Sequence, residues 1–223
     1  MAKARNYFAW QGRVVRPHLG RRVVEVGCGT GNFTGNLLDR ELVVAIDVEA
    51  DCLKRLNRRY PDRPNLHVQL CSPGDAGFDA LRRFQPDSCV CLNVLEHIAD
   101  DRAALEAMAA ILPPGSPIVL LAPAFPALYG PIDRGLGHHR RYTLHSLRRV
   151  ARMAGLETAQ IHYMNLPGFF GWWANAHLFQ RKEQSAAQIA LFDRLLAPFV
   201  SRVESVVAPP FGLSVFAVLR KPA

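Results

Sequence analysis

Short apolar runs alternate with helix-like patterns along the first two-thirds of the chain. The helix-like patterns repeat apolar residues at steps of three and four, as in Leu53, Leu56 and Tyr60. This alternation is typical of βαβ units, in which a parallel sheet carries helices on both faces. The expected strands are 22–26, 42–46, 66–70, 87–92, 118–121, 158–163 and 213–219.

Capping residues and helix breakers mark where three of the expected helices begin and end. Asp51 opens a helix that Pro61 stops. Asp100 and Thr143 are typical N-caps, and Gly155 lies just past the end of the helix that Thr143 begins. We expect a further helix after the first strand.

The last third of the chain has a different pattern. Residues 165–179 are unusually aromatic, and apolar residues from Ile189 onward predict an amphipathic helix that bends at Pro198. We therefore expect one domain over 1–223, with an N-terminal helix in 1–20 and a helical insertion or lid in 165–211. A substrate pocket, a dimer surface, a membrane-adjacent face and an additional helical layer are the alternatives for the insertion.

Composition limits the kind of protein. The 223 residues are 49% hydrophobic and 21% charged, which is a globular rather than a disordered composition. No apolar stretch is long enough to span a bilayer, and the first residues lack the apolar core of a secretory signal. The five cysteines show no spacing typical of a metal site or disulfide framework, so we expect reduced thiols, a cytoplasmic setting and no metal.

The net charge is +8, and most of the 27 basic residues are arginine. Planar guanidinium groups suit phosphates and carboxylates. Nucleic acid and a small acidic substrate are both compatible with this charge.

A glycine-rich turn follows the first expected strand and carries the pattern E-x-G-x-G-x-G from Glu25 to Gly31. Glycines here permit a tight turn and a close approach of the backbone to a ligand. The dinucleotide pattern G-x-G-x-x-G would need glycine where Asn32 stands, and no Gly-Lys-Ser/Thr follows to make a P-loop.

Three segments in order resemble the class I S-adenosylmethionine-dependent methyltransferases, in their small-molecule (type 11/12-like) branch. VVEVGCGTGNFT resembles the family's first motif, VVAIDVEADCL the second, and DSCVCLNVLEHI the segment around the fourth strand. The resemblance covers roughly residues 21–121. It implies a Rossmann-like, mostly parallel sheet of seven strands whose last strand is antiparallel.

The resemblance also implies the residues that would bind S-adenosylmethionine. Asp47 would accept hydrogen bonds from both ribose hydroxyls, and Glu25 would orient the turn and face the amino end of the cofactor. The other implied contacts are Gly27, Cys28, Gly29 and Gly31 in the turn, Val48 against adenine, Ser72 after the third strand and Asn93 after the fourth.

One position departs from the family pattern. An acidic residue commonly follows the third strand and meets the adenine amino group, but here Cys71 and Ser72 follow it. Ser72 as acceptor, Asp75 reaching in, and contact through the backbone alone are the three alternatives.

The segment 122–142 follows the fifth strand, where the fold places a catalytic site. Its string GHHRRYT resembles a GHxRRY element of bacterial methyltransferases encoded among sugar- and lipid-modifying enzymes. His138 or His139 is the expected general base, with His97 as a second candidate or a structural residue. A packed structural loop is the alternative. The expected substrate-binding residues are Tyr129, Asp133, Arg140, Arg141 and Tyr142, with Arg140 or Arg141 gripping an acidic group.

These features predict methyl transfer to oxygen or nitrogen of a small, acidic metabolite or of a glycan- or lipid-linked substrate. A nucleic-acid methyltransferase and a non-catalytic cofactor-binding protein are the alternatives. The first is disfavoured because NVLEH stands where an Asn/Asp-Pro-Pro-Tyr/Phe motif would follow the fourth strand. Peripheral membrane contact and a homo-oligomer stay open.

Overall fold

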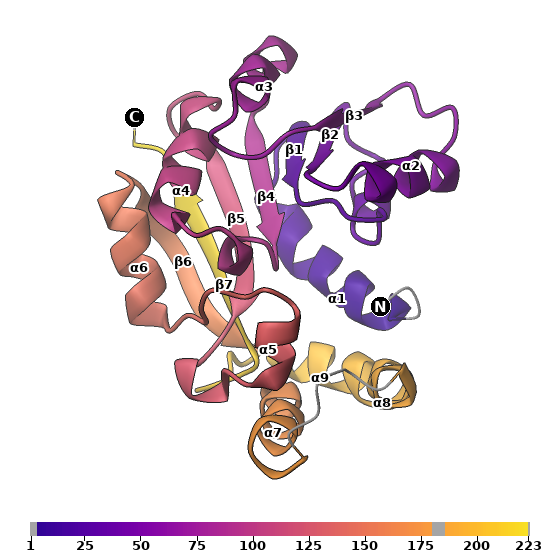
Figure 1. The fold of residues 1–223 in the computed structure, drawn as a ribbon, viewed down its shortest axis with the longest axis vertical. Coiled ribbons are helices and arrows are strands. Elements are labelled where there is room, and N and C mark those ends of the chain that lie inside the picture. Colours follow the sequence, from indigo (N-terminus) through magenta and orange to yellow (C-terminus); the bar gives the residue numbers. More distant parts are fainter. Residues whose placement is uncertain (1–3, 180–185, 223) are drawn as a thin grey trace.

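The structure is a computed structural model that describes residues 4–179 and 186–222. Seven strands form one sheet in the order β3-β2-β1-β4-β5-β7-β6 (Figure 1). Strands β1 to β5 pair in parallel, whereas β7 pairs antiparallel with β5 and β6. The predicted mostly parallel sheet with an antiparallel last strand is thus confirmed. The strands are β1 Arg22–Val26, β2 Leu42–Asp47, β3 Leu66–Leu70, β4 Ser88–Leu92, β5 Pro117–Pro123, β6 Glu157–Met164 and β7 Ser214–Arg220.

Helices cover both faces of this sheet, because successive residues of a strand point to opposite faces. On one face, Val24 and Val44 belong to the same apolar cluster as residues of α4 and α6. On the other face, Val23 and Val43 cluster with Trp10 of α1. The helices are α1 Arg5–Val15, α2 Ala50–Arg59, α3 Ala76–Asp79, α4 Asp101–Ala110, α5 Pro131–Gly135, α6 Leu144–Met153, α7 Leu166–Ala174, α8 Ala186–Leu191 and α9 Ala197–Glu204.

Two predicted N-caps are confirmed. The Asp100 side chain accepts a hydrogen bond from the Ala103 N–H at 2.9 Å. Thr143 accepts one from the Ser146 N–H at 3.0 Å, and the Ser146 hydroxyl accepts one from the Thr143 N–H at 2.8 Å. These side chains satisfy N–H groups that lack a partner within the first turn of a helix.

The helix expected directly after the glycine-rich turn is wrong: the described chain between β1 and β2 has only turns and a 3₁₀ helix, Thr34–Asn36. Gly31, Asn32 and Gly35 all have low helix propensity, and Gly31 has a φ of +79°, outside the helical region. The chain therefore crosses from β1 to β2 through turns and a 3₁₀ helix rather than through an α-helix.

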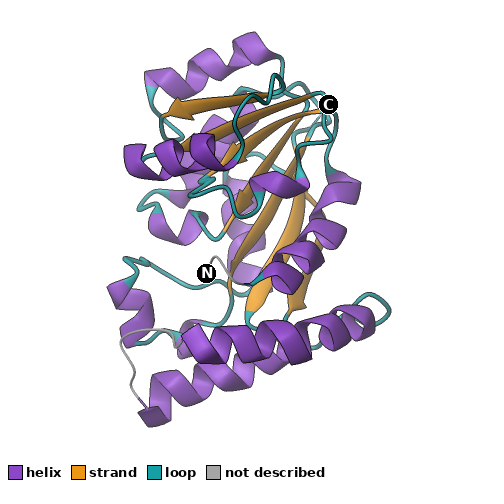
Figure 2. Ribbon diagram, turned by 90° about the vertical axis from the view of Figure 1, so that its right-hand side faces the viewer, coloured by secondary structure: helices purple, strands orange, loops and turns teal. Residues whose placement is uncertain are grey.

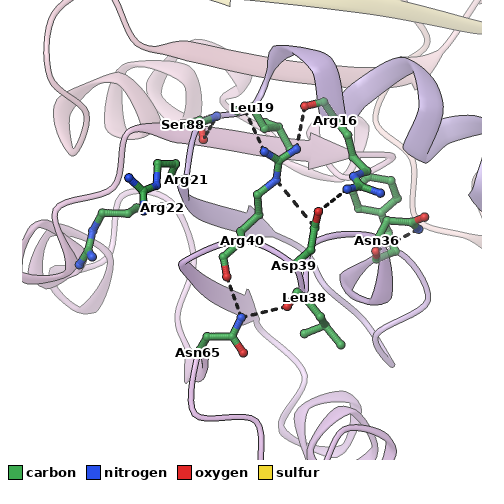
Figure 3. Close-up of polar contacts among 12 residues, drawn as sticks. Arg16, Leu19, Arg21, Arg22, Asn36, Leu38, Asp39, Arg40, Asn65 and Ser88 are labelled. Carbon is green, nitrogen blue, oxygen red and sulfur yellow. Dashed lines mark hydrogen bonds and ion pairs between the residues drawn. The ribbon is translucent and has the colours of Figure 1, made fainter.

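Polar side chains fix the segment that leads from this turn into β2 (Figure 3). The Arg40 guanidinium donates to the carbonyl oxygens of Arg16 at 2.9 Å and Leu19 at 3.5 Å. The Asn65 amide donates to the carbonyls of Leu38 at 3.0 Å and Arg40 at 2.8 Å. These bonds tie the crossover to the end of the N-terminal helix and to the start of β3.

The insertion before β7 lies across the ends of the strands (Figure 2). It contains α7, α8 and α9, and the α-helical pattern changes to a π-helix over Phe192–Leu196, directly before α9. Pro198 explains this interruption, because it has no N–H to donate to the carbonyl of Arg194. None of the helices in 4–179 and 186–222 has the length and apolar character needed to cross a bilayer.

Two carboxylates of the insertion hold it in place, one against α1 and one within the insertion itself. Asp193 is buried and accepts hydrogen bonds from the N–H groups of Asn6 at 3.2 Å and Tyr7 at 2.8 Å, at the start of α1. Glu204 accepts from the N–H groups of Asn165 at 2.9 Å and Leu166 at 3.0 Å, at the start of α7. The insertion and α1 are thereby held together beside the sheet.

Candidate active site

Two adjoining cavities open where β1, β2 and β4 end. The larger has a volume of about 540 Å³ and the smaller a volume of about 500 Å³. Val26, Gly27, Asn93 and His97 line both cavities. One elongated ligand could occupy them together, at the carboxyl ends of the strands where doubly wound sheets bind nucleotides.

The glycine-rich turn lines the larger cavity, and its first glycine, Gly27, also lines the smaller one. The N–H groups of Gly27 and Cys28 each donate to the Ile46 carbonyl at 2.9 Å. Gly27 has a φ of +72°, and a Cβ at this position would lie 2.2 Å from a methyl group of Val94. Only glycine fits here. Together with Cys28 and Gly29, it presents backbone to the larger cavity, whereas Gly31 does not line either cavity.

The Asp47 carboxylate connects β2 to this turn. One oxygen accepts the Gly29 N–H at 2.8 Å and the other accepts the Glu49 N–H at 3.0 Å. Asp47 lines the smaller cavity with Val48 and Ser72, and the Val48 side chain is 65% exposed. A carboxylate retains lone pairs after two such bonds, so Asp47 can accept further hydroxyl groups.

Of the residues expected as alternatives after the third strand, Ser72 lines the smaller cavity and Asp75 does not. The Asp75 carboxylate turns toward its own loop and accepts the Ser72 N–H at 2.9 Å. Cys71 and Pro73 line the smaller cavity together with Ser72.

Glu25 lies at the base of the larger cavity and is buried. Its Oε2 accepts a hydrogen bond from the Thr34 hydroxyl at 2.7 Å. Burial raises the pKa of Glu25 to about 8; the hydrogen bond from Thr34 opposes this shift and the nearby Asp47 charge adds to it. A cationic ligand group beside Glu25 would favour its ionised form.

A buried polar cluster forms another wall of the larger cavity. The Asp133 carboxylate is completely buried and accepts hydrogen bonds from Gly130 N–H at 3.0 Å, His138 Nδ1 at 2.8 Å and Arg141 Nε at 2.8 Å. Burial would raise the pKa of Asp133, but the bonds from His138 and the charge of Arg141 outweigh it and lower that pKa. With Nδ1 donating, the assigned tautomer of His138 leaves Nε2 as an acceptor, 4.0 Å from Oε1 of Glu96.

Backbone pairing brings the segment around His138 to this wall. The Tyr142 N–H donates to the Pro123 carbonyl, and the Phe125 N–H donates to the Tyr142 carbonyl, both at 2.8 Å. The His139 N–H donates to the Glu96 carbonyl at 2.8 Å. The loop after α5 therefore runs back along β5 and onto the loop after β4.

The structure brings His138, His97 and Arg141 to the larger cavity, but it does not bring His139 or the remaining predicted substrate-binding residues there. His139 is exposed, and Asp133 lies behind His138. The Tyr129 hydroxyl donates to the His138 carbonyl at 2.7 Å, and the Tyr142 hydroxyl donates to Asp101 at 2.8 Å.

Both guanidinium groups expected to grip an acidic substrate are engaged within the protein instead. Arg140 pairs with Asp101 at 2.7 Å and donates to the Ala99 carbonyl at 2.6 Å. Arg141, besides Asp133, donates to the Ala124 carbonyl at 3.0 Å and lies over the Trp172 ring at 4.6 Å. Arg140 and Arg141 thus bond to groups of the protein itself, a role that the sequence alone could not distinguish from binding of a substrate.

Several lining residues were not assigned to the site from the sequence. Glu96 belongs to the segment NVLEH, but no role was predicted for it from the sequence. It is 1% exposed and lines the larger cavity. Trp172 and Phe192 come from the insertion, and Tyr7 from α1. The many aromatic residues in 165–179 indicated that the insertion could line a pocket. The sequence around Tyr7 contains no pattern that would place this residue at a cavity.

Comparisons with known proteins agree with this geometry. A ubiquinone biosynthesis O-methyltransferase of Ralstonia nicotianae is 27% identical over 179 residues, covering 72% of this chain and 73% of that protein. A Mycobacterium tuberculosis protein named as an uncharacterized methyltransferase is 32% identical over 111 residues, 48% of this chain and 52% of that protein. The chain thus spans about half the length of the mycobacterial relative it matches.

Solved structures share the fold. A methyltransferase from Mesorhizobium loti, described as S-adenosylmethionine-dependent, has a TM-score of 0.62 at 16% identity and covers 95% of this chain and 96% of its own. A geranyl diphosphate methyltransferase in complex with SAM has a TM-score of 0.63 at 14% identity. The match covers 95% of this chain and 84% of that chain. Residues 12–161, more than half of the chain, match the family described as a methyltransferase domain, and the chain therefore belongs to this methyltransferase family.

Proposed function

We propose that this protein transfers a methyl group from S-adenosylmethionine to an oxygen or nitrogen atom of a small molecule with a large apolar part. The observation that carries the proposal is the pair of adjoining cavities. The smaller one holds Asp47, Val48 and Ser72, and the larger one holds Glu25 and the polar cluster around His138. This order matches a nucleoside, a charged amino-acid end and an acceptor site.

The chain's residues suit each part of the cofactor. Asp47 would accept the ribose hydroxyls, Val48 would pack on adenine, and Gly27 and Gly29 would allow the sulfonium end to pass close to the backbone. Glu25, buried and with a raised pKa, would ionise beside the ammonium group of the methionine part. S-adenosylmethionine supplies the methyl group and the leaving thioether, so the protein mainly aligns the acceptor and manages its proton.

The acceptor is proposed to be apolar over most of its surface because apolar side chains dominate the larger cavity. Tyr7, Phe8, Trp172, Ile189 and Phe192 line it from α1 and the insertion. Two matched proteins carry names that fit such an acceptor: a ubiquinone biosynthesis O-methyltransferase and a geranyl diphosphate methyltransferase. A lipid-linked substrate is therefore favoured over a free acidic metabolite.

His138 is the residue best placed to accept the acceptor's proton directly. Its Nε2 carries the lone pair, its ring is held by Asp133, and it lines the larger cavity. Deprotonation makes a hydroxyl group a stronger nucleophile. The oxygen then attacks the methyl carbon in line with the departing sulfur.

A methyl-donor assay with isotopically labelled S-adenosylmethionine tests the proposal. Lipid-soluble and water-soluble fractions of a bacterial extract serve as acceptor pools, and mass spectrometry identifies the product. The expected result is label in the lipid-soluble fraction that depends on Asp47. Transfer only to nucleic acid, or only to water-soluble acidic metabolites, would contradict the proposed acceptor class.

A further inference from the structure

Three potential metal-binding side chains meet at the wall of the larger cavity. Glu96 and His97 follow β4, whereas His138 follows α5, 41 residues later in the chain. Their donor atoms all lie within 4.8 Å of one another, and the rings of His97 and His138 are 4.6 Å apart at 88°. We call Glu96, His97 and His138 the Glu–His–His cluster.

One carboxylate oxygen of Glu96 has no hydrogen-bond partner among the described residues. The Glu96 side chain is 1% exposed, and this oxygen, Oε2, is buried. Arg141 lies near, but its guanidinium is bonded to Asp133 and to the Ala124 carbonyl. A buried carboxylate oxygen without a donor is costly, and burial raises the pKa of Glu96 to about 8 although a backbone hydrogen bond opposes the shift. A bound cation would remove this cost.

His138 is held as a metal-binding histidine is usually held. Its Nδ1 donates to Asp133, which fixes the ring and leaves Nε2 4.0 Å from Oε1 of Glu96. Histidines that bind metal through one nitrogen commonly donate from the other to a carboxylate, which fixes the tautomer. Asp133 is itself immobilised by Gly130 and Arg141, so the ring has little freedom to turn.

We propose that the Glu–His–His cluster binds one divalent transition-metal ion, with Asp133 as the carboxylate that positions His138. Two imidazoles and one carboxylate suit Zn²⁺, Mn²⁺, Fe²⁺ or Co²⁺ rather than Ca²⁺. Neighbouring donors around such an ion lie roughly 3.4 Å apart for bonds of about 2.1 Å, so distances within the cluster, which reach up to 4.8 Å, must shorten by up to about 1.4 Å. His97 is exposed and stands at the rim of the cluster, where such a movement meets least resistance.

This inference rests on the proposed function and deepens it. An ion with three protein ligands keeps a position open toward the cavity, where an acceptor hydroxyl can bind and its pKa falls. The hydroxyl then loses its proton to solvent. Its oxygen forms a bond to the methyl carbon while the carbon–sulfur bond breaks, and that electron pair stays on the sulfur as the neutral thioether. When the ion is bound, Nε2 of His138 is a metal ligand and is not free to accept a proton. The ion then activates the acceptor hydroxyl in place of His138.

Sequence spacing could not reveal the cluster, which is why no metal was expected from the sequence. Glu96 and His97 are adjacent, and the third donor comes from a loop that reaches them only through the return of the chain along β5. The proposed site therefore depends on the tertiary fold rather than on a local motif.

Metal titration of the untagged full chain tests the proposal. The chain is dialysed against a chelator, checked for folding by circular dichroism, and titrated with Zn²⁺, Mn²⁺ and Co²⁺ chlorides by calorimetry. The visible absorption of bound Co²⁺ gives a second readout. We expect one ion per chain, and at least a tenfold loss of affinity in Glu96→Gln and His138→Gln. Asp133→Asn should lower the affinity about 10–100-fold.

Two exposed residues outside the cluster provide matched controls, Glu157→Gln and His145→Gln, which should bind the ion as the parent does. Absence of stoichiometric binding, or binding that is unchanged in Glu96→Gln and His138→Gln, would overturn the inference. S-adenosylmethionine binding measured in chelator separates the two proposals. Cofactor binding without any metal binding would refute the cluster and leave His138 as the proton acceptor, whereas metal binding without cofactor binding would refute the proposed function.

Discussion

The Nδ1 atom of His138 lies 2.8 Å from Oδ1 of Asp133, and this carboxylate is completely buried. The pair links the loop after β5 to the wall of the larger cavity. It also separates the two histidines of the segment, because His138 lines the cavity and His139 is exposed.

Replacement of His138 should affect turnover far more than replacement of His139. We expect His138→Ala to lower the methyl-transfer rate by about 10²–10⁴-fold, whether it accepts a proton or holds an ion. His139→Ala should stay close to the parent, since only its backbone N–H contacts the site. Single-turnover kinetics with saturating cofactor measure both. Equal losses in the two variants would contradict this assignment.

Removal of the Arg141 charge should destabilise the fold rather than weaken substrate binding. Arg141→Met leaves the buried Asp133 carboxylate without its main cation, and breaking a buried pair costs about 3–5 kcal/mol. Urea unfolding measures the free energy. Arg148→Met, at an exposed position of α6, is the control and should change it little. A stable Arg141→Met variant with a raised KM would restore the direct substrate role.

Loss of the Asp47 carboxylate should weaken cofactor binding. Asp47→Ala removes the proposed acceptor of the ribose hydroxyls and the bond to Gly29, at a cost of roughly 1–3 kcal/mol in binding. Calorimetry with S-adenosylmethionine and its demethylated product gives the affinity. The matched control is Asp51→Ala, an exposed residue in the next helix. Unchanged affinity in a folded Asp47→Ala protein would show that the ribose is bound elsewhere.

Glu25 should make both stability and cofactor binding depend on pH. Its pKa rises from 4.5 to about 8 on folding, so the ionised form is disfavoured in the folded state without cofactor. Its contribution to stability is full below pH 4.5 and is lost as the pH rises through 8. Relative to Glu25→Gln, the free energy of unfolding of the parent should therefore fall between pH 5 and about 8.

The same group predicts proton release on binding. A cofactor ammonium beside Glu25 favours the carboxylate, so affinity should increase by up to about tenfold per pH unit between about pH 6 and 7.5. Calorimetry in buffers of different ionisation enthalpy measures the released proton, and Glu25→Gln should abolish it. Proton uptake, or no pH dependence in the parent, is the contrary result.

Local patterns in the sequence predicted most of the fold correctly. Strand runs and the caps Asp100 and Thr143 depend on residues close together in the chain. The helix after the glycine-rich turn was wrong because Gly31 and Gly35 prevent it, although the strand–helix alternation favours one. The strand–helix alternation predicts a helix in a typical connection between parallel strands. In the connection between β1 and β2, two glycines prevent that helix.

Residues of the half of the site proposed for the cofactor could be placed from the sequence more easily than those of the half proposed for the acceptor. Asp47 and the glycines stand at strand ends, where the parallel sheet itself brings them together. The cluster of Glu96, His138 and Asp133 depends on the pairing of Ala124 with Tyr142, which turns the loop back over β4. The packed loop likewise determines which arginines form ion pairs with Asp101 and Asp133.

Calorimetric titration of the full chain with S-adenosylmethionine, its demethylated product and NAD tests the central claim most directly. The account predicts one molecule of S-adenosylmethionine or product bound per chain, with micromolar or tighter affinity, and no heat with NAD. No heat with S-adenosylmethionine or its product, together with binding of NAD, would contradict it.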